Sequence, residues 1–341
     1  MWKLLNRTPS AYALNLIEDA RQSGHDLLAG LNISQMELIA NQSMPFDDFN
    51  RVVDAYDEWS TNPDWGFHLG SKLGITAHGA LGVCALSADT IGEGLEVFCQ
   101  FIATRSCSIT AEVILDDGQI RAEFLHSGPM RKHLKAMTES LAVIVINFIS
   151  TASGRNNPEL HWIFPYPQPE NVSAYSDALS GTFEFDGSIF SVCLPAEMAG
   201  QASLLKDKNL HRTTRLQCEH ELDEVRENPD FAYITSLLSS ALIKRMSEPE
   251  PATVLPMTED LARQLNMSPR TLMRRLKVNG TSMREIKDAL VREYALDMLA
   301  RGVLSVSDIA MKLGYDNPGN FTRACKRLLG KTPNGLRRGV L

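Results

Sequence analysis

The chain has 341 residues, of which 44% are hydrophobic, so it can form two or three domains with a sizeable core and is neither disordered nor fibrous. The formal net charge of −7 is unevenly spread. Residues 256–341 contain sixteen Lys and Arg against eight Asp and Glu, a balance of +8, which leaves −15 for residues 1–255. A basic module joined to an acidic domain is typical of nucleic-acid-binding proteins.

Cysteine and histidine spacing argues against disulfide and metal sites. The six cysteines include no Cys-x-x-Cys pair, which favours reduced thiols in a cytosol. The eight histidines have no metal-binding spacing, so we expect no metal ion and no cofactor. The N-terminus has no signal-peptide core, and the longest apolar run, Leu141 to Ile149, is shorter than the roughly 20 residues that cross a bilayer. The sequence therefore predicts a cytoplasmic protein without a membrane segment.

Helical periodicity dominates the first part of the chain. Apolar residues recur at helical spacing in residues 11–21, 34–40 and 45–59. Thr90 and Glu93 form a capping box, which predicts the start of a helix that runs to about residue 104. A long helix is predicted from Pro129 to about residue 150, apolar on nearly every side in its second half and therefore central to its domain.

Alternating apolar residues predict strands between and after these helices. Residues 109–115 and 120–124 alternate around Asp116-Asp117-Gly118, which predicts a β-hairpin. Residues 160–164 predict another strand, and residues 183–192 complete the sheet. Helices followed by strands and further helices indicate an α+β domain over residues 1–197.

Residues 198–256 are predicted to join this domain to the C-terminal one. The chain is polar from residue 199 to residue 215, and residues 216–226 and 231–246 then predict two helices. Ser247 to Thr253 contains two prolines among polar residues, which is typical of a linker.

Two helix-turn-helix units are predicted in residues 257–341, which makes the C-terminal domain all-α. We expect Thr258 to cap the first helix, and Ser268 with Pro269 to start the second, over residues 269–277. Capping boxes at residues 282–285 and 305–308 start a connecting helix and the first helix of the second unit. Asn317 and Pro318 start its second helix, over residues 318–328. The predicted core residues of the two second helices are Leu272, Leu276, Phe321, Cys325 and Leu328.

The opposite faces of these two helices carry basic and polar residues, as expected of helices that enter a DNA major groove. In the first unit the candidate DNA-binding residues are Arg270, Thr271, Met273, Arg274 and Lys277. In the second unit they are Gly319, Asn320, Thr322, Arg323, Lys326 and Arg327. Two such faces in one domain would enter successive major grooves, about 34 Å apart.

The segment from Leu261 to Arg338 resembles the DNA-binding domain of AraC/XylS transcription regulators. The matching segments include Ser268–Leu276, Leu304–Ala310, Leu313–Tyr315, Phe321–Arg327 and Gly330–Pro333. The N-terminal part resembles the arabinose-binding-like sensor domain of one branch of this family, through residues 79–82 and 86–95.

This resemblance implies a dimeric or ligand-gated regulator, usually an activator that contacts RNA polymerase. It also implies base reading by Arg270, Met273, Arg274, Gly319, Asn320 and Arg323. Two positions depart from common members of the family, because Met273 offers no hydrogen bond and Pro318-Gly319 replaces two side chains that reach bases. The second helix is therefore expected to rely more on phosphate contacts.

The sequence thus predicts a sequence-specific DNA-binding transcriptional regulator, an effector-responsive activator that forms a homodimer. The alternative is an effector-independent regulator whose N-terminal domain only dimerises. No nucleophile elbow or Cys/His pairing can be identified, so an enzyme is not expected. The effector-binding residues are not identified, but the apolar helices 90–104 and 129–150 are the expected walls of the site and favour a hydrophobic or amphipathic small molecule.

Overall fold

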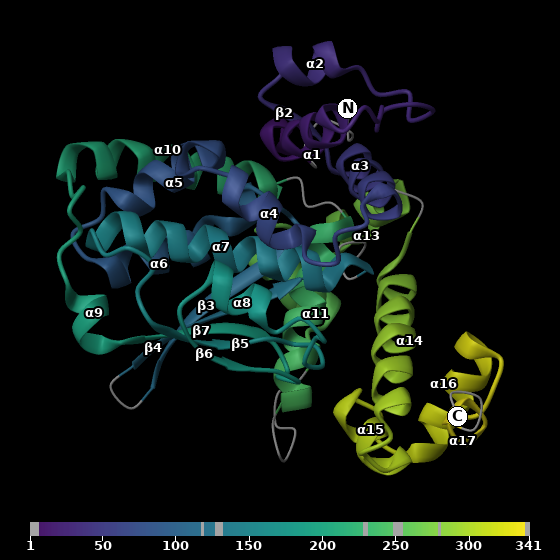
Figure 1. Ribbon diagram of the computed structural model, residues 1–341. Coiled ribbons are helices and arrows are strands. Elements are labelled where there is room, and N and C mark those ends of the chain that lie inside the picture. Colours follow the sequence, from purple (N-terminus) through teal and green to yellow (C-terminus); the bar gives the residue numbers. More distant parts are fainter. Residues whose placement is uncertain are drawn as a thin grey trace. The chain divides into compact units, whose positions relative to one another are not determined.

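The protein forms two compact units, Met1–Asp230 (unit 1) and Phe231–Leu341 (unit 2) (Figure 1). The structure is a computed structural model that describes residues 7–116, 119–126, 132–227, 231–247, 255–278 and 281–337. The division falls inside the segment expected to join the domains, since α10 (Lys208–Glu227) belongs to unit 1 and α11 (Phe231–Ser247) to unit 2. The Pro-rich part of that segment, residues 248–254, lies outside the described residues.

Unit 1 begins with helices around a two-stranded sheet, in which β1 (Arg7–Pro9) pairs antiparallel with β2 (Ser43–Pro45). The Ser34 hydroxyl accepts a hydrogen bond from the Glu37 N–H and caps the second of these helices. The helical elements up to the main sheet are α1 (Ser10–Gln22), α2 (Gln35–Ala40), α3 (Phe46–Trp59), α4 (Trp65–Lys72), the 3-10 turns η2 (Ile75–His78) and η3 (Ile102–Thr104), α5 (Gly79–Leu86) and α6 (Ile91–Phe101).

A mixed five-stranded sheet follows, with the spatial order β3-β4-β7-β5-β6. Its strands are β3 (Ile109–Asp116), β4 (Gln119–His126), β5 (Leu160–Ile163), β6 (Gly181–Glu184) and β7 (Phe190–Pro195). β3 and β4 form the predicted antiparallel hairpin, whose turn residues 117–118 lie outside the described residues. β5 and β6 pair in parallel through the short crossover helix α8 (Ser173–Ala178), which the sequence analysis did not predict.

The inner face of this sheet is a cluster of aromatic and apolar side chains. Phe124 of β4 lies opposite Phe190 of β7, with ring centroids 5.8 Å apart, and Trp162 of β5 stacks on Phe190 at 6.3 Å. All three side chains are buried. The alternation read from the sequence therefore corresponds to one buried face, which α6 and α7 (Leu134–Ser153) contact.

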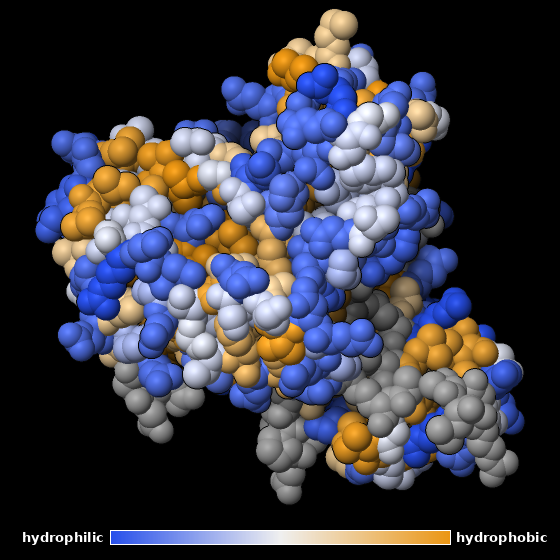
Figure 2. All heavy atoms as spheres, in the orientation of Figure 1, coloured by the Kyte–Doolittle hydropathy of each residue, from blue (hydrophilic) through white to orange (hydrophobic). Residues whose placement is uncertain are grey.

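Helix α7 is the central element of unit 1. It begins at Leu134 rather than near Pro129, which lies outside the described residues. Among the described residues α7 is long and apolar enough to cross a membrane, as is the bent pair of α4 with residues 75–86, but 83% of the most apolar window of α7 is buried in the structure. Hydrophilic residues lie between smaller apolar areas on the face that Figure 2 shows.

Two glycines of α4 allow it to lie directly against α7. A Cβ atom on Gly66 would come within 2.2 Å of the Ala136 carbonyl oxygen, and one on Gly70 would come within 2.6 Å of the Ser140 carbonyl oxygen. Side chains at these two positions would therefore force the helix backbones apart, because both obstructing atoms belong to the main chain.

The sequence predicts a polar connection over residues 199–215, but helix α10 already begins at Lys208. The first half of this helix is therefore not predicted from the sequence. One stripe of α10, formed by Thr214, Cys218 and Leu222, is buried, and the helix packs mainly on α5. These buried residues are spaced at four-residue intervals, but two of them are polar or small, so the stripe gives a weak hydrophobic signal.

Unit 2 is all-α, as predicted. Its helices after α11 are α12 (Thr258–Gln264), α13 (Pro269–Val278), α14 (Met283–Arg301), α15 (Val306–Lys312), α16 (Pro318–Leu329) and α17 (Pro333–Arg337). Helices α15, α16 and α17 gather at the C-terminal end of α14 (Figure 1). The predicted capping box at Ser305 and Asp308 is present, and Ser282 caps α14.

Two local expectations in unit 2 were wrong. Thr258 is the first residue of α12 and does not cap it; Met257 holds the cap position, and its N–H donates to the Asp260 carboxylate at 3.0 Å. In α16, Ala324 is buried with Phe321 and Cys325, whereas Leu328 is only half-buried, because it lies near the end of the helix.

We predict that Gly66→Ala destabilises unit 1 by about 1–3 kcal/mol, because the added methyl group meets the α7 backbone and the resulting strain exceeds the small gain in helix propensity. All four tryptophans of the chain lie in residues 1–230, so urea unfolding followed by tryptophan fluorescence reports on unit 1 alone. Gly200→Ala is the matched control, since a Cβ atom there meets nothing within 4 Å. Equal unfolding midpoints for the two variants would contradict the close packing of α4 on α7.

Candidate nucleic-acid interface and ligand cleft

Helix α13 presents a basic face above a small apolar core. Leu272 and Leu276 are buried, one helical turn apart. Ser268 starts the helix as predicted, because its hydroxyl accepts the Thr271 N–H at 3.1 Å. The Thr271 hydroxyl is itself within 2.9 Å of the Ser268 hydroxyl, so this predicted DNA-binding side chain takes part in the cap.

The remaining predicted residues of α13 are exposed together on one face. They are Arg270, Met273, Arg274 and Lys277. None of the three basic side chains has an ion-pair or hydrogen-bond partner within the part of the chain that the structure describes. Their charges are therefore available to a phosphate or a base edge.

Helix α16 is the corresponding element of the second helix-turn-helix unit. The Asn317 side chain accepts the Asn320 N–H at 2.9 Å, and Pro318 follows as the first helical residue. Arg323 and Lys326 are exposed, and the Arg323 guanidinium donates to the Asn320 side-chain oxygen at 2.5 Å. The other predicted residues of this face are exposed Gly319 and half-buried Thr322.

Arg327 differs from its neighbours because it is held by a carboxylate of α14. Its Nη1 and Nη2 atoms donate to the two oxygens of Asp288 at 2.5 and 2.8 Å. This bidentate pair lowers the pKa of Asp288 and raises that of Arg327. The predicted DNA-binding role of Arg327 thus competes with a role in fixing α16 to α14.

The end of α11 is bound to the end of α15, the first helix of the second helix-turn-helix unit. Arg245 donates from Nε and Nη2 to the Met311 carbonyl at 3.1 and 2.8 Å, and Lys312 Nζ donates to the Met246 carbonyl at 2.6 Å. Each helix thus supplies a cation to the C-terminal carbonyl end of the other. The sequence analysis did not identify this reciprocal contact, because the paired residues are 66 positions apart.

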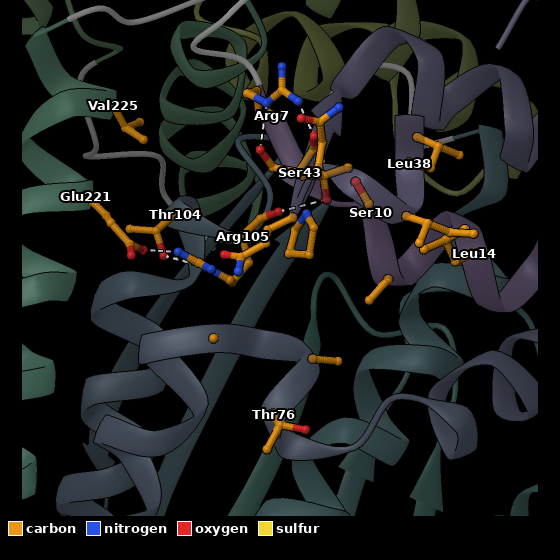
Figure 3. A pocket seen from close by; sticks show the side chains of 18 of the residues that line it. Arg7, Ser10, Leu14, Leu38, Ser43, Thr76, Thr104, Arg105, Glu221 and Val225 are labelled. Carbon is orange, nitrogen blue, oxygen red and sulfur yellow. Dashed lines mark hydrogen bonds and ion pairs between the residues drawn. The ribbon is translucent and has the colours of Figure 1, made fainter. Parts of the chain in front are cut away.

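Unit 1 contains an open cleft of about 660 Å³ (Figure 3). At one side, Arg7 Nε donates to the Ser43 hydroxyl at 2.6 Å. At the other, the Arg105 guanidinium pairs with the Glu221 carboxylate of α10 and donates from Nε to the Thr104 hydroxyl at 3.0 Å. Leu14, Leu38 and Val225 add apolar surface, so the cleft has a mixed lining with charged groups at its sides.

A smaller apolar cavity of about 60 Å³ adjoins this cleft, and Thr8 and Arg105 line both. Its walls include Phe98 of α6, Ile102 of η3, and Met137, Leu141 and Ile144 of α7. These are the two helical segments that the sequence analysis expected to line an effector site. Among the described residues, no group of three or more His, Cys, Asp or Glu side chains is placed to hold a metal ion.

Comparison with known proteins identifies both units. The family model described as the arabinose-binding domain of AraC transcription regulators, N-terminal, matches residues 23–202, and that of a helix-turn-helix domain matches residues 261–339. The ornithine utilization regulator of Pseudomonas aeruginosa is 26% identical over 335 residues, 96% of each protein. VirS of Mycobacterium tuberculosis, a helix-turn-helix transcriptional regulator, is 25% identical over 301 residues, 86% of this chain and 84% of VirS.

A solved structure resembles the chain along most of its length. The transcriptional regulator CdpR from Pseudomonas aeruginosa is 20% identical, with a TM-score of 0.44, and the likeness covers 96% of this chain and 98% of CdpR.

We predict that Asp288→Asn strengthens binding to random duplex DNA, because it releases the Arg327 guanidinium from its pair. One additional phosphate contact should steepen the slope of log affinity against log salt by about 0.9. Titrations at several salt concentrations measure this slope, and Glu259→Gln, which removes an exposed carboxylate of α12 that has no ion-pair partner among the described residues, is the control. An unchanged slope for Asp288→Asn would show that Arg327 does not reach DNA when released.

The same pair should contribute to the stability of unit 2 in a pH-dependent way. Because the folded-state pKa of Asp288 is lowered, its contribution is present above its ordinary pKa, about 3.9, and is lost as the pH falls through the lowered value. The melting temperature of the wild-type protein should thus exceed that of Asp288→Asn at neutral pH, and the difference should shrink in acid.

Proposed function

Because the chain belongs to the AraC family of transcription regulators, we propose that it is an effector-responsive activator that reads two successive major grooves with α13 and α16. The protein is a DNA-binding regulator with a ligand-binding-like N-terminal domain, and not an enzyme. The observation that carries the proposal is the pair of capped, exposed basic helices within one compact unit.

The dimensions of the connecting helix support double-groove reading. α14 has 19 residues, which corresponds to about 28 Å at a rise of 1.5 Å per residue. Successive major grooves on one side of a duplex are about 34 Å apart. A rigid helix of this length between the two helix-turn-helix units is therefore of the size needed to hold α13 and α16 one helical turn of DNA apart.

The two helices are proposed to contribute differently. On α13, Arg270 and Arg274 are free to bond bidentately to guanine O6 and N7, a contact worth about 1–3 kcal/mol of discrimination. On α16, Gly319 offers no side chain, and Arg323 already bonds Asn320. We assign α16 mainly to phosphate contacts, through Arg323 and Lys326, with Asn320 and Thr322 supporting them.

A small-molecule effector is proposed to bind in unit 1. The cleft volume of about 660 Å³ lies within the roughly 300–1,000 Å³ that small-molecule sites occupy. Charged groups beside apolar ones suit an amphipathic metabolite. One relative is named for ornithine utilization, so L-ornithine belongs among the compounds to be tested.

The proposal also includes a cytoplasmic homodimer that contacts RNA polymerase. Exposed leucines at positions 204, 205, 210 and 216, in and just before α10, provide apolar surface for a second subunit. A regulator of this family acts where the chromosome and the polymerase are, which is the basis for the proposed location.

We predict that Arg274→Ala lowers affinity for the selected operator by about 1–3 kcal/mol and relaxes the base preference at one position. The operator is obtained by selecting random duplexes with the full-length protein, and two short elements about one helical turn apart are expected. Lys326→Ala is the matched comparison, because losing a phosphate contact should weaken specific and random DNA alike and flatten the salt dependence. Equal losses on specific and random DNA for Arg274→Ala would remove its base-reading role.

We predict that at least one compound in a metabolite panel raises the melting temperature of the full-length protein and changes its operator affinity. A ligand that binds only the folded state must stabilise it, by about 2.7 kcal/mol at one hundred times its dissociation constant. Residues 256–341 alone, which lack unit 1, serve as the control and should not respond. Operator binding and transcription that respond to no compound would favour an effector-independent regulator with a purely dimerising N-terminal domain.

A further inference from the structure

Arg105 lies at the boundary between the polar cleft and the apolar cavity. It lines both, and its side chain is only 15% exposed. Gly79 permits this position, because a Cβ atom there would come within 2.9 Å of Arg105 Nη1. A guanidinium with little access to water needs an anionic partner, and Glu221 supplies one from α10.

The cavity beside Arg105 has room for a short apolar group. Its volume of about 60 Å³ corresponds to about four to six water-sized groups. Phe98, Leu141 and Ile144 are among the side chains that enclose it. An apolar tail of a few carbons would fill this space, whereas water there would find few hydrogen-bond partners.

A second polar side chain at the cavity, His78, has one nitrogen atom without a hydrogen-bond partner among the described residues. His78 is 2% exposed and lines the cavity, and its Nε2 atom has no hydrogen-bond partner among the described residues. Its Nδ1 atom lies 2.6 Å from the Tyr12 hydroxyl. Burial and the nearby Arg105 cation lower the pKa of His78 to about 4, so the ring is neutral at pH 7. When Tyr12 donates to Nδ1, Nε2 carries a hydrogen that has no acceptor.

We propose that this boundary is a binding site for a small carboxylate with a short apolar tail. Its carboxylate bonds Arg105, with His78 Nε2–H as a further donor, and its tail fills the cavity between α6 and α7. The inference rests on the proposed function, since it identifies the chemical class of the effector.

Binding at this site has a consequence for α10. Arg105 is paired with Glu221, so a ligand carboxylate competes with Glu221 for the same guanidinium. Glu221 lies six residues before the end of α10, and unit 2 follows in the chain at Phe231. The ligand therefore exchanges an internal ion pair for its own and releases a side chain of the helix that leads to the DNA-binding unit.

The test uses full-length protein and calorimetric titration with hexanoate. Three matched probes each change one feature of hexanoate. Hexan-1-ol lacks its charge, hexylammonium has the opposite charge, and acetate lacks its apolar tail. Hexanoate should bind at least about tenfold more tightly than each of them, the difference expected for losing one charge-assisted hydrogen bond or a buried tail. Equal binding of hexanoate, hexan-1-ol and hexylammonium would overturn the proposal.

Two substitutions give opposite expected results. Arg105→Gln should weaken hexanoate binding at least about tenfold, because it removes the charged donor. Glu221→Gln should strengthen it several-fold, because the internal competitor loses its charge, and a misfolded variant would not bind more tightly. If Glu221→Gln weakened binding, or if neither substitution changed it, the competition for Arg105 would be refuted.

Operator binding, measured with and without hexanoate, separates this inference from the proposed function. If hexanoate binds as described but leaves operator affinity and transcription unchanged, the carboxylate site stands and its role as effector site fails. If no carboxylate probe binds, but another metabolite changes operator affinity, the effector-responsive regulator stands and the carboxylate site fails.

Discussion

The direct contact between α4 and α7 is the constraint on which unit 1 depends. Because Gly66 and Gly70 carry no side chains, the two helices approach to main-chain contact, and α7 is buried along most of its length. This fixed position of α7 determines where Met137, Leu141 and Ile144 stand relative to α6, and therefore the shape of the cavity beside Arg105. The cavity is therefore formed mainly by the packing of helices.

Much of the fold could be predicted because its signals are local. Capping residues such as Ser268, Ser282 and Ser305 bond N–H groups only three positions away, so sequence spacing identifies them directly. The β3–β4 hairpin is equally local. The parallel pairing of β5 with β6 depends on a crossover through α8, and the start of α10 depends on a buried stripe that includes Thr214 and Cys218; neither has a clear periodic signal.

The candidate site was predictable to a different extent in each unit. Helical periodicity separates the exposed face of α13 from its buried leucines, because the spacing of apolar residues along one helix is enough to identify its buried side. It does not reveal that Arg327 is paired, since Asp288 lies 39 positions earlier. The ligand cleft draws on residues as distant as Arg7 and Glu221, and only the folded chain brings them to one place.

The reciprocal contact between α11 and α15 ties α11 to the second helix-turn-helix unit. Arg245 and Lys312 join the helix nearest to unit 1 in sequence directly to the end of α15, the first helix of the second helix-turn-helix unit. α11 also packs on α14, the helix that connects the two helix-turn-helix units, so its position is fixed against both the connecting helix and the second of these units.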